Sequence, residues 1–150
     1  MKKPKSVKTG LDEQIAELAG RTDHRALAIW ACDCTERVLP YFEKNHPEDD
    51  RPRRAIDAGR AWARTGAFRM ADVRRVALAA HAAAREAGGD DTARSAARAA
   101  GQALATAHVP GHAIAAAVYA ATAVRGGVEI ADAAVIKERG RQYLHLLELQ

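Results

Sequence analysis

Residues 91–124 decide the fold, with the sequence DTARSAARAAGQALATAHVPGHAIAAAVYAATAV. Alanine, the residue with the highest helix propensity, dominates this stretch, and a Val-Pro-Gly sequence at 109–111 interrupts it. Pro110 disfavours helical geometry at the residue before it and suits the first turn of a new helix. We therefore expect one helix from Asp90 or Asp91 to about His108 and another from Pro110 to about Val124.

The part of this stretch from Ala99 to Val124 contains no Asp, Glu, Lys or Arg, and its length alone would span a bilayer. Its composition argues against a membrane segment, because alanine is only weakly apolar and polar side chains interrupt it. These polar side chains are Gln102, Thr106, His108 and His112. We interpret Ala99–Val124 as the buried centre of a helical bundle, and we expect no interaction with a membrane.

The remaining sequence has the same character, since 36 of the 150 residues are alanine and apolar residues recur at three- and four-residue spacing. Runs of alternating β-branched residues bounded by turns are missing. Asp, Pro and Gly at suitable positions predict a short helix over 11–19 and longer helices over about 24–42, 52–66, 70–87 and 130–149. Pro40 should kink or end its helix. The predicted fold is all-α, a single antiparallel bundle of five to six Ala-rich helices.

The formal net charge of +4 comes from the first ten residues. They contain four lysines and no acidic residue, whereas the rest of the chain contains 19 basic and 19 acidic residues. Lysine-rich termini are typically disordered, and the remaining length suits one domain. We expect a disordered basic tail over residues 1–10 and a single helical domain over residues 11–150.

Charge is unevenly distributed within this domain. Residues 11–50 contain 4 basic and 10 acidic residues, whereas residues 51–100 contain 11 arginines and 5 acidic residues. The two segments could form oppositely charged faces, or antiparallel helices could bring them together so that they neutralise each other. The arginines leave nucleic-acid binding open, but their alternation with alanine is equally typical of a solvated helix face, and we expect no nucleic-acid partner.

Cys32 and Cys34 stand two positions apart, roughly 200° around a helix, and so can neither form a disulfide with each other nor share a metal ion. Reduced thiols are typical of cytoplasmic proteins. The charged first residues are not followed by an apolar segment of the secretory type. The sequence therefore predicts a cytoplasmic protein.

Six polar residues form the candidate functional or polar-core cluster, namely Asp33, Arg37, His81, Arg85, His108 and His112. If Asp33 and the histidines converged, they could bind zinc or a similar metal ion. Their spacing matches no established metal motif, however, and histidines that form hydrogen bonds inside or beside the core are the alternative. We expect no metal and no cofactor. Asp33 and Arg37, four residues apart, are expected to pair along one helix, although Arg85 or a histidine could also serve Asp33.

Trp30, Trp62 and Arg60 are candidate interface anchors, because tryptophan and arginine are enriched at the energetic centres of protein interfaces. Each tryptophan also lies on an apolar helical stripe, which favours a place in the core. The sequence contains no Gly-rich phosphate loop, no HExxH and no G-x-S-x-G, and we predict no catalytic residues. A homodimer stays open, since an exposed Ala-rich helix face could pair symmetrically.

Several blocks of the sequence resemble the Imm five-like immunity-protein family of bacterial polymorphic toxin systems. The most specific blocks are Trp30–Pro40 (WACDCTERVLP) and Thr106–His112 (TAHVPGH). The likeness also includes Asp49–Arg53, Ala58–Ala63, Ala79–Arg85 and Ala103–Ala113, and it extends over roughly residues 24–125.

The resemblance implies a cytoplasmic, antitoxin-like protein that binds and neutralises a cognate toxin. Immunity proteins typically capture their toxins through electrostatic complementarity, so either the acidic segment 11–50 or the Arg-rich segment 51–100 would be the contact face. The alternative hypothesis is a small-ligand or metal-dependent helical enzyme that uses Asp33, His81, His108 and His112.

Overall fold

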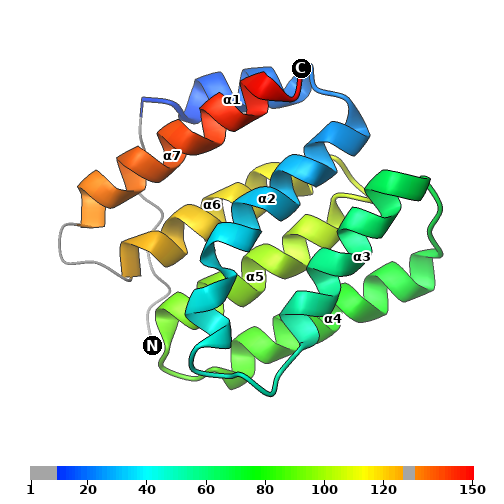
Figure 1. Ribbon diagram of the computed structural model, residues 1–150, viewed down its shortest axis with the longest axis vertical. Helices are drawn as coiled ribbons and strands as arrows, with labels where there is room; N and C mark the ends of the chain where they lie inside the picture. The colour runs from blue at the N-terminus through cyan, green and yellow to red at the C-terminus, as the bar shows by residue number, and fades with distance from the viewer. Residues whose placement is uncertain (1–9, 127–130) are drawn as a thin grey trace.

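The computed structural model describes residues 10–126 and 131–150, and these residues form seven helices and no strand (Figure 1). The helices are α1 (Asp12–Gly20), α2 (His24–Glu43), α3 (Arg51–Thr65), α4 (Met70–Glu86), α5 (Asp91–Ala105), α6 (His112–Gly126) and α7 (Ala131–Glu148). The all-α prediction is confirmed, but five to six helices is too few. The short α1 is a helix of its own that packs against α7. The predicted tail over residues 1–10 lies outside the described residues except for Gly10, and so does the expected start of the last helix at Ile130.

Caps fix the helix boundaries that the sequence indicates. Asp23 begins α2, because its Oδ2 accepts hydrogen bonds of 3.1 and 3.2 Å from two backbone N–H groups of the first turn. Asp90 begins α5 in the same way, through one hydrogen bond of 3.1 Å. Gly66 ends α3 with a φ of 72°, a left-handed conformation that favours glycine.

Two prolines of the sequence act differently on the helices. Pro110 lies between α5 and α6, so the predicted break is confirmed, although α5 already ends at Ala105 and α6 begins at His112. Pro40 does not end α2, which continues to Glu43. Pro40 is exposed in the last turn of α2, where its missing N–H removes a single hydrogen bond, and its carbonyl oxygen still accepts one of 2.9 Å from the N–H of Lys44.

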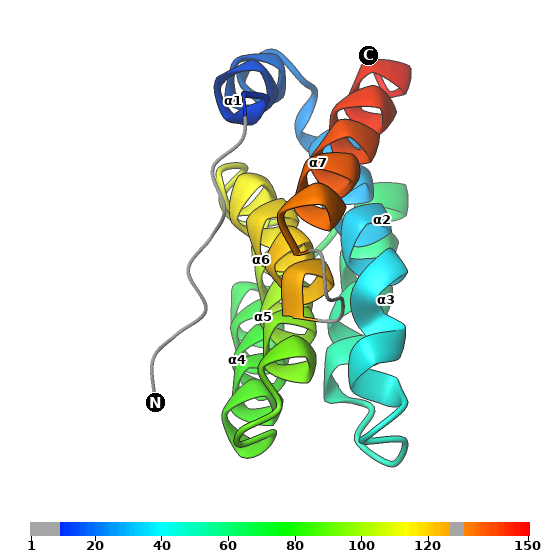
Figure 2. The same ribbon diagram turned by 90° about the vertical axis from the view of Figure 1, so that its left-hand side faces the viewer.

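The central helix of the bundle is α5, which contacts α2, α3, α4 and α6. The helices α4, α5 and α6 lie side by side, and α2 and α3 pack across them (Figures 1 and 2). At one end of the bundle α1 and α7 lie together, and α7 also contacts α6 and α2. Most of α5 and about half of α6 are buried, as predicted for the centre of the bundle. None of the described helices has the length and hydropathy of a membrane-spanning segment.

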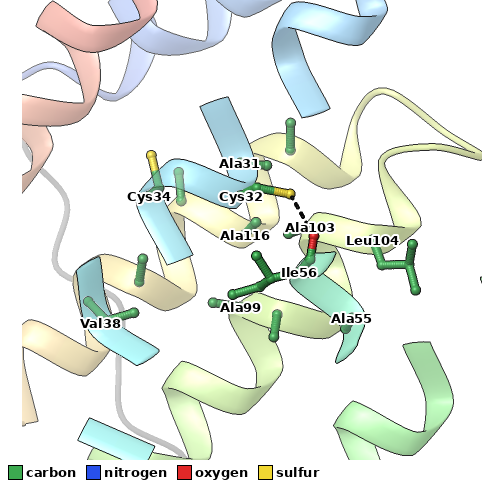
Figure 3. Packing of buried hydrophobic residues seen from close by; sticks show 14 of the residues in the cluster. Ala31, Cys32, Cys34, Val38, Ala55, Ile56, Ala99, Ala103, Leu104 and Ala116 are labelled. Carbon is green, nitrogen blue, oxygen red and sulfur yellow. Dashed lines mark hydrogen bonds between the residues drawn. The ribbon is translucent and has the colours of Figure 1, made fainter. Parts of the chain in front are cut away.

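Small side chains allow α2, α3 and α5 to approach closely at one crossing. A Cβ atom added to Gly59 of α3 would lie 2.9 Å from Cys32 Sγ of α2 and 3.7 Å from the Cα of Leu104 of α5. Figure 3 shows this part of the core, in which Cys32 Sγ points to the carbonyl oxygen of Ile56 at 3.8 Å and alanines from four helices surround it. Small side chains therefore fill most of the crossing, beside Ile56 and Leu104.

Both cysteines are free, as their spacing predicted, and both are buried. Burial raises the pKa of the Cys32 thiol to about 12, and it raises the pKa of Cys34 as well. A thiol that stays protonated is a weak nucleophile and a poor metal ligand. Cys32 and Cys34 thus serve as small apolar residues of the core.

Replacing Gly59 by valine should destabilise the fold, because the added side chain has no room beside Cys32 and Leu104. Overpacking of this kind lowers the free energy of unfolding by about 1–3 kcal/mol, which urea denaturation would measure. Gly140→Val is the matched control, since a Cβ at Gly140 of α7 would have no atom within 4 Å. Equal effects of the two substitutions would contradict the close approach at Gly59.

Candidate functional site

Asp33 connects three helices. It lies half-buried on α2, between the two buried cysteines. Its Oδ1 accepts a hydrogen bond of 2.7 Å from Arg60 Nη1 of α3, and its Oδ2 accepts one of 2.7 Å from His145 Nε2 of α7. The other ring nitrogen of His145, Nδ1, lies 3.3 Å from a carboxylate oxygen of Glu148. Asp33 and His145, together with Glu36 and Arg37, line an open depression of about 450 Å³.

Arg37 pairs with Glu138 of α7 and not with Asp33, which corrects the expected pairing along α2. The distance from Arg37 Nη2 to Glu138 Oε2 is 2.7 Å. Burial lowers the pKa of Arg37, but the hydrogen bond and the charge of Glu138 outweigh this effect and raise it overall. A pair along one helix stabilises by only about 0.2–0.5 kcal/mol, whereas a buried carboxylate such as Glu138 requires a cation. Arg37 therefore turns towards α7.

Behind this ion pair, α7 buries a row of polar side chains, namely Glu138, Arg139 and Gln142. Arg139 donates hydrogen bonds to Gln142 Oε1 at 2.8 Å and to Asp12 Oδ1 of α1 at 3.1 Å. Gln142 Nε2 donates to the carbonyl oxygen of Ala117 in α6 at 2.9 Å. These bonds attach α7 to α1 and α6, in addition to the Arg37 contact with α2.

Glu138, Gln142 and His145 are functional candidates that the sequence did not predict. Their spacing of four and three residues places them on one face of a helix, so this face of α7 combines three polar residues directed at the bundle. The sequence did contain one indication of this site, because polar residues occupy a face of α7 where apolar residues are expected. Their partners lie on α2 and α6, and Arg37 and Asp33 of α2 are more than a hundred residues away from Glu138 and His145 along the chain.

Acidic and basic segments neutralise each other where α2 meets α3. Arg53 of α3 bridges Glu36 and Glu43 of α2, at 2.7 and 3.0 Å. Arg60 pairs with Asp33 at 2.7 Å and reaches Glu36 at 3.5 Å. Of the two arrangements that the sequence left open, mutual neutralisation is the one found between these helices.

The candidate interface anchors lie mainly inside the protein. Trp30 is fully buried, and its indole N–H donates a hydrogen bond of 2.8 Å to the carbonyl oxygen of Gln142. Trp62 is 7% exposed and packs against His24 and Phe68, with ring-centroid distances of 4.6 and 6.4 Å. Trp62 and Phe68 line an apolar groove of about 420 Å³ between α3 and α4. Arg60, as described above, belongs to the Asp33 network.

His81 lies on α4 against the backbone of α5. A Cβ atom added to Gly101 of α5 would come within 2.6 Å of its Nε2. Burial, together with the positive charges of Arg98 and Arg85 and the nearby His112, lowers the pKa of His81 to about 4. His112 in turn donates a hydrogen bond of 2.7 Å from Nδ1 to Gln102 Oε1.

The structure places five of the six candidate residues in two separate groups and leaves His108 apart from both. Asp33 and Arg37 belong to the network of α2, α3 and α7, in which none of the three candidate histidines takes part. His81, Arg85 and His112 belong to the layer of α4, α5 and α6, and His108 is exposed in the turn after α5. Within residues 10–126 and 131–150, no three His, Cys, Asp or Glu side chains are grouped so that they could bind a metal ion.

A protein-family model described as "Imm-5 like putative immunity protein" matches residues 17–149. The chain belongs to this family. The match extends from α1 to the end of α7 and so includes both groups of polar residues. No curated protein and no solved structure matches the chain.

Replacing Glu138 by glutamine should destabilise the protein, because Arg37 and Gln142 lose a charged acceptor that is only 3% exposed. We expect the free energy of unfolding to fall by about 2 kcal/mol, less than for a fully buried pair, since the Arg37 side chain is 32% exposed and water can solvate it. Glu148→Gln is the matched control, and its carboxylate is 74% exposed, so we expect a loss below about 0.5 kcal/mol. Similar losses in the two variants would contradict a structural role for Glu138.

The stability of the protein should decrease as the pH falls from about 6.5 to about 4, in part because of His81. The pKa of His81 in the folded protein is about 4, below the ordinary value of 6.5, so the unfolded state binds more protons in this range. In His81→Gln this contribution is absent, and the variant should lose about 2 kcal/mol less stability than the wild type over the same range. His108→Gln, in an exposed turn, is the matched control. Identical pH profiles for wild type and His81→Gln would refute this role of His81.

Proposed function

We propose that this protein is a bacterial immunity protein that binds a cognate toxin in the cytoplasm and neutralises it without catalysis. Membership of the Imm-5 like family over residues 17–149 carries the proposal. An immunity protein acts by forming a complex with its cognate toxin, and this chain would contribute a preformed helical surface to that complex.

The Asp33 network supports a binding role over an enzymatic one. A general acid or base must reach the proton of a substrate, within hydrogen-bond distance or through one water molecule. Both carboxylate oxygens of Asp33 already accept hydrogen bonds, and the Arg37 guanidinium is paired with Glu138. Asp33 and Arg37 hold α2, α3 and α7 together, and this structural role accounts for both side chains.

The proposal predicts protection by stoichiometric binding. Cells that express the toxin encoded beside this gene should survive when they also express this protein, and the two purified proteins should form a stable complex. Because each molecule of a binding protein stays occupied in a complex with one toxin molecule, protection should require at least one molecule per toxin molecule. A titration of toxin activity in vitro with the purified protein measures this ratio.

An inactivated toxin variant is the control, and it should bind as well as the active toxin. Protection at far less than one molecule per toxin, with covalent modification of the toxin or its substrate, would indicate an enzyme. If no complex forms and the cells die, the immunity function is refuted.

A further inference from the structure

The arginines of α3 and α4 differ in their partners. On α3, Arg51, Arg53 and Arg60 all pair with carboxylates at 3.0 Å or less. By contrast, Arg74 and Arg85 on α4 have no carboxylate partner among the described residues, and the same holds for Arg98 of α5. Arg75 and Arg94 do pair with carboxylates, those of Asp72 and Asp91, so within the segment 51–100 the pairing is incomplete and leaves Arg74, Arg85 and Arg98 without an ion pair among the described residues.

Arg74 and Arg85 lie on one face of α4 together with Leu78 and His81. The four residues are separated by four, three and four positions, a spacing that places them along one side of a helix. Buried residues of α4 such as Ala80 and Ala83 lie on another side of the helix, and His81 lies at the edge of the exposed row, against α5. Leu78 is 58% exposed, and both arginines are exposed as well. We call these four residues, with Arg98 of the neighbouring α5, the α4 face.

The arginines of the α4 face form no ion pair with any carboxylate of the described residues. The charged and titratable groups that act on His81 are Arg85 of α4, Arg98 of α5 and His112 of α6, and no carboxylate is among them. Together with burial, they hold the pKa of His81 at about 4. Burial is the largest cause of this low pKa, and the neighbouring arginines add to it, so the geometry places His81 beside cationic side chains that carboxylates of a partner could neutralise.

We infer that the α4 face is the surface that captures the toxin and that it binds an acidic patch of the toxin, with Leu78 at the centre of the contact. This inference rests on the proposed immunity function and specifies its site. Opposite charges accelerate association between proteins, and an apolar centre with a polar rim is the usual arrangement of a protein interface. A nucleic-acid backbone would place phosphates against Leu78, so the exposed leucine favours a protein partner.

Charge reversal on the α4 face tests this inference. In R74E/R85E, two cations become acidic, and the affinity for the toxin encoded beside this gene should fall roughly 100-fold, mainly through slower association. The matched control is R21E/R141E, which changes the net charge by the same amount at exposed positions of the α1–α7 end. The control should bind within about threefold of the wild type. Surface plasmon resonance at several salt concentrations measures both, and circular dichroism checks that both variants fold.

A second measurement follows His81 directly. An NMR titration of the imidazole in the free protein should give a pKa near the value of about 4 described above. In the complex with the toxin, carboxylates beside His81 should raise this pKa by about one unit or more. Leu78→Ala should weaken the complex by roughly tenfold without changing the His81 pKa of the free protein.

The possible results separate the surface from the function. If R74E/R85E binds the toxin as tightly as the wild type, or no more weakly than the control, the α4 face is not the docking surface, although the immunity function stands. If the wild type neither binds the toxin nor protects, the immunity function fails, and a labelled polyglutamate peptide then tests the surface. If R74E/R85E binds this peptide more weakly than the control variant does, the α4 face binds acidic partners. If the two variants bind the peptide equally, the assignment of the α4 face to an acidic partner is overturned. Tight, salt-sensitive binding of duplex DNA that R74E/R85E abolishes would overturn the assignment to an acidic protein.

Discussion

Close contact between helices through alanine and glycine is the constraint on which the structure depends. An alanine side chain buries little apolar surface, so each contact contributes little, and stability has to come from many contacts at short distance. The fold meets this requirement by surrounding α5 with four other helices and burying nine of its residues. At Gly59 the approach of α2, α3 and α5 leaves no room for even one additional carbon atom.

In contrast to the alanine contacts around α5, α7 is attached to the bundle largely through polar groups. Burial of Glu138, Arg139 and Gln142 is costly unless each polar group has a partner. Each of them has one, on α1, α2 or α6, and Trp30 adds a hydrogen bond to the backbone of α7. Hydrogen bonds are directional, unlike contacts between alanines, so we interpret this network as the feature that fixes the position of α7 on the bundle.

Features that depend on neighbouring residues could be predicted from the sequence, whereas those that depend on distant residues could not. The caps at Asp23 and Asp90 and the break at Pro110 follow from local chemistry, and the structure confirms them. The expected pairing of Asp33 with Arg37 fails, because Glu138 lies 101 residues beyond Arg37 and becomes its neighbour only in the folded protein. A single cluster of Asp33 with the histidines was one of the two alternatives that the sequence left open, but helix packing places Asp33 and His81 in different groups.

The arrangement of helices also determines which arginines are structural. The helix α3 lies beside the acidic α2, and Arg53 and Arg60 of α3 neutralise Asp33, Glu36 and Glu43. The helix α4 lies beside α3 and α5, and its outer face has no acidic neighbour for Arg74 or Arg85. Repulsion among like charges costs some stability, and nothing within the described chain offsets it on this face. Negative charge from a binding partner would offset this repulsion. The unpaired arginines of α4 would therefore favour association with an acidic partner.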